Sequence, residues 1–217
     1  NVDDSAWEAL QLAVVSDADT RRKISFLEGE LLGGYSSFDW RGRSKSLQIA
    51  VDILSTVKDE DDYKRGWIEH TLVPQTKLVM GFGTGGPESD NVFIVTAAIR
   101  AIGKVAASLQ DDDERKRITR DVLLPQLSSS INSLFKETAV ATIDALAEVT
   151  ASIPDPEFKR SVVSDLGVAF GDDVSSQVRS AAVQGIATIW SPADNTADRA
   201  QAVSQFLVPA LQIKWDE

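Results

Sequence analysis

The chain has 217 residues, of which 43% are hydrophobic and 25% charged, with no cysteine, one histidine and a net charge of −11. This length suits one or two domains with a hydrophobic core, and the lack of cysteine excludes disulfides and thiolate metal sites. Because nucleic acids and anionic membranes are themselves negative, the charge disfavours both as partners. No run of about 18 apolar residues occurs, so no membrane-spanning helix is expected.

Two alternating types of amphipathic segment run along the chain and predict helices. The A-type segment carries a basic residue about ten positions before a proline or small residue, and it often follows acidic residues that can cap a helix. The B-type segment is rich in alanine, and its apolar residues recur at i and i+3 as one helix face requires. In chain order we predict a lone B-type helix at 4–16, A–B pairs at 20–32/44–58, 60–79/89–109, 112–130/135–152 and 156–170/174–190, and a lone A-type helix at 197–213.

The repeat is clearest in two register positions. The basic position of the A-type segments recurs at intervals of 40 to 51 residues, at Lys23, Lys64, Arg115, Lys159 and Arg199. The central apolar position of the B-type segments recurs in step with it, at Leu10, Val51, Ile99, Ile143 and Val183. Periods of this length are typical of stacked helix pairs. No alternating run bounded by turns predicts a strand, so the expected fold class is all-α.

Proline and glycine mark where the A-type segments differ. Pro74, Pro125 and Pro209 share one register position, and we expect a bend in the helix there. The fourth A-type segment departs from this pattern, because it has Gly167 and Ala169 instead.

The stretches LLPQL followed by TAVATIDALAEV, and DVSSQVRSAAVQGIATI, resemble HEAT repeats. In that family the proline-bearing helix is the first, or A, helix of a repeat and the alanine-rich helix is the second, or B, helix. The resemblance implies an α-α superhelix, a HEAT-like or armadillo-like solenoid of about ten antiparallel helices, forming a single domain over 1–217. Since both lone terminal helices keep the apolar residues of the internal pattern, we also expect a segment of a longer solenoid.

The stretch GFGTGG at 81–86 matches the spacing of a dinucleotide-binding turn. The residues before it continue a predicted helix, however, and no second strand with a ribose-binding acid follows, so the required βαβ unit is missing. The register shows instead that this A–B loop is about seven residues longer than its neighbours. We interpret it as a flexible contact loop and expect no nucleotide or other small-molecule cofactor.

The A–B loop at 33–46 is expected on the same edge, one repeat away, and holds the most basic patch of the chain. Aromatic residues beside arginines are typical of protein interfaces, although the aromatic side chains could instead close the helix ends beneath the loop. HEAT arrays of the tubulin-binding kind use such loops for recognition. The candidate partner-binding residues are Tyr35, Phe38, Trp40, Arg41 and Arg43, with Phe82 of the longer loop.

The opposite edge is acidic, because aspartates and glutamates gather in each B–A turn, as at 59–62 and 111–114. They can serve as helix caps, or form a ridge that meets a basic partner. We expect the recurring basic residue of each A helix to pair with these acids, or with acids of the adjacent repeat.

No catalytic or metal site is predicted, since the single histidine, His70, lies mid-helix without a facing partner. We therefore expect a non-enzymatic scaffold or adaptor, cytoplasmic or nuclear, that binds other proteins, including basic ones, through loop edges and an inner groove. The polar positions expected on that groove are Gln48, Asp52, Arg100, Lys104, Asp144, Glu148, Arg179 and Gln184. Two alternatives stay open: a tubulin-handling HEAT protein (microtubule regulator or tubulin-folding cofactor), against which the negative charge argues, and a transport-receptor or proteasome-adaptor segment.

Overall fold

The computed structural model describes residues 4–17, 19–32, 40–57, 60–76, 88–131, 136–171 and 173–191, together with residues 200, 203, 204 and 208. Over these ranges the chain is all-helical, without a strand, as predicted. Counting uninterrupted segments as one helix, the described residues form about nine helices rather than ten. The tenth, predicted over 197–213, lies outside the described residues except for four single positions. The chain divides into two compact units, residues 1–110 and 111–217.

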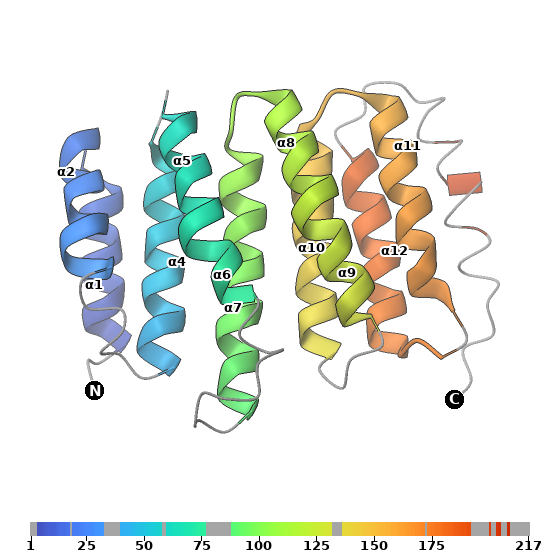
Figure 1. Cartoon of the computed structure of the whole chain (residues 1–217), viewed down its shortest axis with the longest axis horizontal. Coiled ribbons are helices and arrows are strands. Elements are labelled where there is room, and N and C mark those ends of the chain that lie inside the picture. The colour runs from blue at the N-terminus through green and yellow to red at the C-terminus, as the bar shows by residue number, and fades with distance from the viewer. Residues whose placement is uncertain are drawn as a thin grey trace. The chain divides into compact units, whose positions relative to one another are not determined.

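In the first unit, three B helices pack in sequence, α1 (Asp4–Val15) on α4 (Trp40–Thr56) and α4 on α7 (Glu88–Ala107) (Figure 1). Two A helices cover them. One consists of α2 (Thr20–Phe26) and η1 (Leu27–Leu32), and the other of α5 (Asp61–Trp67), η2 (Ile68–Leu72) and α6 (Val73–Thr76). The segment η1 packs on α4, whereas η2 and α6 pack on α7. The core between the layers is made of fully buried leucine and isoleucine side chains, among them Leu27, Ile53, Leu72, Ile99 and Ile102.

In the second unit, α10 (Lys136–Ser152) and α12 (Ser176–Trp190) are the B helices and pack on each other. The first A helix consists of α8 (Asp112–Ile118), η4 (Thr119–Leu123) and α9 (Leu124–Ser130), and all three segments contact α10. The second consists of α11 (Pro156–Asp165), which contacts both α10 and α12, and η5 (Leu166–Phe170), which packs on α12.

Small residues let the B helices approach closely. The position before the central apolar residue holds Ala50, Ala98, Thr142 and Ala182, and each is at most 1% exposed. At Gly185 the approach of α12 to α10 is closer still, because a Cβ atom there would lie 3.0 Å from Cγ2 of Ile143. This is tighter than side chains normally pack, so a glycine suits the position.

The first three A helices each contain a π turn, and in two of them a proline stands two positions after the last residue of the turn. The N–H of Val73 donates to the carbonyl of Ile68, and the N–H of Leu124 donates to the carbonyl of Thr119. Proline has no N–H and its ring crowds the carbonyl four residues earlier. The extra residue of a π turn changes which carbonyl faces the ring. The turn in η1 is followed by glycine, so proline is not its general cause, and the fourth A helix ends in the 3₁₀ segment η5 instead.

Candidate functional site

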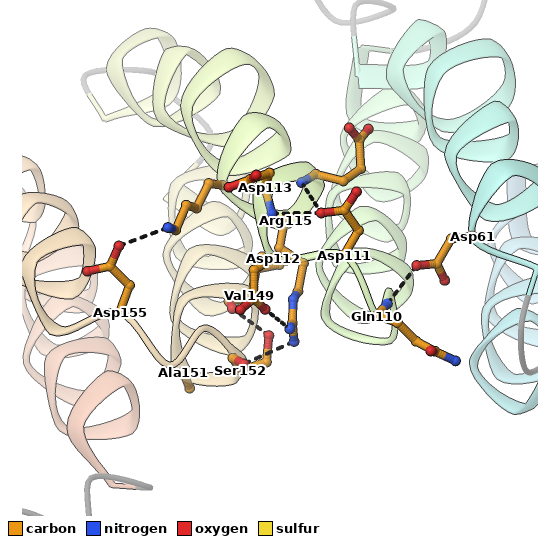
Figure 2. Close-up of polar contacts among 12 residues, drawn as sticks. Asp61, Gln110, Asp111, Asp112, Asp113, Arg115, Val149, Ala151, Ser152 and Asp155 are labelled. Carbon is orange, nitrogen blue, oxygen red and sulfur yellow. Dashed lines mark hydrogen bonds and ion pairs between the residues drawn. The ribbon is translucent and has the colours of Figure 1, made fainter.

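Three of the four A helices begin with an aspartate that caps the helix. The Oδ1 atom of Asp111 accepts from the N–H groups of Asp113 (2.9 Å) and Glu114 (3.4 Å) (Figure 2). The carboxylates of Asp19 and Asp155 bond the N–H groups two and three residues on in the same way. These bonds satisfy N–H groups that have no partner inside the helix. The acidic turns therefore act as helix caps here, one of the two interpretations that the sequence left open.

The helix α5 begins differently, because its N-cap residue Glu60 makes no side-chain cap bond. Instead, Oδ2 of the next residue, Asp61, accepts from the N–H of Gln110 at 2.7 Å (Figure 2). This bond links the start of α5 to the segment that follows α7. An acidic residue therefore stabilises the start of this A helix as well, although it does not cap the helix.

The recurring basic residue of each A helix reaches the end of a B helix. Nζ of Lys23 donates to Oγ1 of Thr56 (2.8 Å), and Nζ of Lys64 to the carbonyl of Ser108 (3.0 Å). The equivalent bonds of the second unit both end on α10: Arg115 Nη1 donates to Ser152 O at 2.9 Å, and Lys159 Nζ to Ala151 O at 3.2 Å. The three lysines are 7%, 2% and 6% exposed, in chain order.

These contacts differ from the expected ion pairs with carboxylates. The last carbonyls of a helix lack partners inside the helix and carry its negative dipole end. In three of the four contacts a cation from a neighbouring helix satisfies both, which explains why a basic residue recurs near the unfavourable N-terminus of its own helix. Lys23 donates to a hydroxyl group at the end of its B helix instead. Arg115 does pair with a carboxylate as well, that of Asp112.

A further cluster of charges joins the two A helices of the second unit. Nζ of Lys116 lies 2.8 Å from Oδ2 of Asp155, and Lys116 and Arg120 lie over the ring of Phe158, at 5.9 Å and 4.9 Å from its centroid. The hydrogen bond to Asp155 is the main cause that raises the pKa of Lys116. The same bond, with the N–H groups of Phe158 and Glu157, holds the pKa of Asp155 below its ordinary value. This edge of the second unit is therefore held together by its own charges.

On the exposed face of the B helices, the first unit carries a polar row that links three helices. The carboxylate of Asp52 on α4 accepts from Nε2 of Gln11 on α1 and from Nε2 of Gln48 at 3.1 Å. Nζ of Lys104 on α7 lies 3.9 Å from Oδ1 of Asp52. The side chains of Lys104 and Asp52 are only 44% and 23% exposed, respectively, so this row is fixed in place yet reachable from solvent. Gln11 was not among the predicted polar positions, although it shares the register position of Asp52.

Other side chains on these helices project outward. Arg100 is exposed on α7, and Phe93, two turns earlier, is 51% exposed. In the second unit, Asp144 and Glu148 are exposed one turn apart on α10, and Gln184 is exposed on α12. The exposed side chains Arg100 and Lys104 thus make α7 of the first unit cationic, whereas Asp144 and Glu148 make α10 of the second unit acidic. Arg179 differs from the prediction, because its Nη1 donates to the carbonyl of Val174 at 2.8 Å and the side chain stays half-buried at the start of α12.

The predicted loop site falls largely outside the described residues. Tyr35, Phe38 and Phe82 are not described, nor is the stretch at 81–86. Trp40 and Arg41 form the first turn of α4, without a description of their side chains, and Arg43 follows as a half-buried residue. The loop site stays a prediction. His70 lies exposed in η2.

Within the described ranges, no group of three or more histidine, cysteine, aspartate or glutamate side chains is placed to hold a metal ion. None of the described helices has both the length and the apolar content needed to cross a membrane. Comparison of the chain with models of protein families, with curated proteins and with solved structures finds no match.

Proposed function

We propose that this chain is a HEAT-like α-solenoid that acts without catalysis, as a scaffold or adaptor that binds other proteins. The observation that carries the proposal is the exposed B-helix face, where Asp52, Arg100 and Lys104 lie on helices held at fixed spacing by a fully buried core. Side chains that are already held in position cost less entropy to engage when a partner binds. A face of this kind suits a helix or extended peptide of a partner protein.

The solenoid part of the proposal rests on helix caps and cation contacts that recur at equivalent positions of the A helices. Asp19, Asp111 and Asp155 cap three A helices with the same pair of bonds, and the basic residue four positions later reaches the end of a B helix each time. Features that recur at one register position in different repeats favour a stack of equivalent helix pairs. Such a stack offers several separated contacts, so that modest individual affinities combine.

The proposal is tested by reversing charge on one face at a time. We expect Arg100→Glu with Lys104→Glu to reduce recovery of partner proteins from lysate, and to weaken binding of the purified partner at least about tenfold, as loss of charged contacts at an interface does. Arg21→Glu with Arg22→Glu is the matched control, because it makes the same change of charge on exposed positions of α2. Equal loss in both variants would point to net charge rather than to the B-helix face, and unchanged binding in both would contradict the assignment.

A further inference from the structure

Helix α7 reaches solvent through one narrow stripe of side chains. Between residues 92 and 106 all residues are buried except four, namely Phe93, Ala97, Arg100 and Lys104. Their spacing of i, i+4, i+7 and i+11 places them along one face of the helix. Phe93 is 51% exposed, so the stripe has an aromatic end and a cationic end, with a small residue between them.

The same face stays open where a B helix has a described neighbour on each side. Helix α4 packs on both α1 and α7, and its residues at the register positions of Arg100 and Lys104 are Asp52 and Thr56. Asp52 is half-buried and Thr56 is exposed. The exposure of the α7 stripe therefore belongs to the face on which it lies and does not require that a neighbouring helix be absent.

The polar row beside this stripe leaves both cations available to a carboxylate of a partner. The two oxygens of Asp52 already accept from the amide groups of Gln11 and Gln48. Nζ of Lys104 lies 3.9 Å from Oδ1 of Asp52, beyond hydrogen-bond distance, so Asp52 attracts the ammonium group without using its N–H donors. Between the described residues, no ion pair engages Arg100.

The spacing and charge of the stripe fit an acidic amphipathic helix. Arg100 and Lys104 are separated by about 6 Å along the helix axis, which is also the separation of two carboxylates at i and i+4 of a facing helix. Phe93 lies about 10 Å before Arg100, so an apolar side chain two turns from the carboxylates would cover it. The net charge of −11 disfavours a nucleic acid as the alternative occupant.

The pair of cations occurs on α7 alone among the described B helices. At the same two register positions the other B helices carry Gln11 and Val15, Asp52 and Thr56, Asp144 and Glu148, and Gln184 and Thr188. An acidic segment would therefore be attracted to α7 in particular, rather than to the B-helix face in general.

We propose that α7 binds an acidic amphipathic helix of a partner protein, with two carboxylates on Arg100 and Lys104 and an apolar side chain on Phe93. An arginine can hold a carboxylate through two parallel hydrogen bonds, and a half-exposed aromatic ring gives the contact an apolar anchor. The inference rests on the proposed function, since it names the kind of partner segment that this face binds, and it adds Phe93 to the contact.

The experiment is fluorescence anisotropy with the whole chain and labelled probe peptides of about 18 residues, long enough to form a helix. The acidic probe is alanine-rich, with two glutamates one turn apart and a leucine two turns from them. A second probe has glutamines in place of the glutamates, and a third has alanine in place of the leucine. The acidic probe should bind with a dissociation constant of ~100 µM, as a small contact does. The other two probes should bind about fivefold more weakly.

Variants of the chain then link each probe group to its contact. Arg100→Gln with Lys104→Gln should weaken binding of the acidic probe about tenfold and leave binding of the glutamine probe unchanged, because both changes remove the same contact. Phe93→Ala should likewise weaken binding of the acidic probe about fivefold and leave binding of the alanine-substituted probe unchanged. All three residues are exposed, so folding should be unaffected, which circular dichroism checks.

Two matched controls make the same kinds of change elsewhere. Arg21→Gln with Arg22→Gln removes two exposed cations from α2, and Val168→Ala shortens an apolar side chain that is 54% exposed in η5. Both controls should bind the acidic probe as the wild type does. A loss in the arginine control equal to that of the α7 variant would show that net charge governs binding, and would overturn the proposal.

Three further results would overturn the proposal. They are equal binding of the acidic and glutamine probes, no rise in anisotropy up to about 1 mM protein, and tighter binding of a single-stranded oligonucleotide than of the acidic probe at the same two cations. The proposed function has a separate measurement. If the acidic and glutamine probes bind alike while Arg100→Glu with Lys104→Glu still reduces recovery of partner proteins, the acidic helix is wrong and the B-helix face still binds partners.

Discussion

Two A helices of the second unit, α8–η4–α9 and α11–η5, begin alike and end differently. Each starts at a capping aspartate, and each places a cation four residues later that bonds a carbonyl at the end of α10. Beyond that point the first helix continues along α10 through a π turn, whereas the second passes from α10 to α12 and ends in a 3₁₀ turn. The start of a helix is thus set by local residues, and its end by the surface on which it packs.

The sequence difference between these helices lies in their second halves. The first has Leu123 and Leu127, which are at most 1% exposed, on either side of Pro125. The second has Gly167 and Ala169 in the corresponding stretch, and a Cβ atom added at Gly167 would meet no heavy atom within 4 Å. With less apolar volume to bury, the second helix gains less from continuing along one neighbour.

The largest effect is expected where a cation supports the end of α10. Replacing Arg115 by methionine removes its bonds to the carbonyl of Ser152 and to Asp112 from a side chain that is only 13% exposed. Loss of charged hydrogen bonds at a largely buried site should lower the free energy of unfolding by about 3 kcal/mol, measured by urea denaturation. Arg117→Met is the control, since its pair with Glu114 involves a side chain that is 40% exposed and should cost less than about 1 kcal/mol. Similar losses for both would show that Arg115 has no special role.

The contact between α10 and α12 is tested next. Gly185→Val adds three carbon atoms where a Cβ atom alone would lie 3.0 Å from Cγ2 of Ile143, and overpacking of this kind should cost about 2 kcal/mol in the free energy of unfolding. Gly167→Ala is the matched glycine in η5, and because its surroundings are open it should stabilise by about 0.5 kcal/mol. If both substitutions shifted the denaturation midpoint in the same direction, the close approach of α10 and α12 would be contradicted.

Asp155 should make the second A helix sensitive to acid. Its pKa is lowered in the folded state, first by the bond from Lys116 and then by the N–H groups that it caps. The stability that it contributes is therefore present above its unfolded pKa and is lost as the pH falls through its folded pKa. The asparagine of an Asp155→Asn variant still caps the helix but cannot titrate. The difference in denaturation midpoint between wild type and variant should shrink as the pH falls through the folded pKa of Asp155. A difference independent of pH would argue against the pairing of Asp155 with Lys116.

Much of this architecture follows from the sequence, and the reasons for the exceptions are physical. Helices predicted over 112–130 and 156–170 are present as α8–η4–α9 and α11–η5, because capping residues and apolar periodicity are local signals. The carbonyl partners of Arg115 and Lys159 could not be read from the sequence, since they depend on where another helix ends. The same holds for the row of Gln11, Asp52 and Lys104, whose members come from three helices.

The smallest effect is expected for Lys159 of α11, the other cation that bonds a carbonyl at the end of α10. This prediction distinguishes the two A helices most sharply. Burial lowers the pKa of Lys159, so its charge is less favourable in the folded chain than in the unfolded chain. Lys159→Met removes this cost together with the bond to Ala151 O, and the two changes should cancel to within about 1 kcal/mol at neutral pH. Because the folded pKa is the lower one, the wild type should gain stability relative to the variant as the pH rises from the folded toward the unfolded pKa. Urea denaturation at neutral and alkaline pH measures this, and a loss as large as that of Arg115→Met would show that both cations support α10 equally.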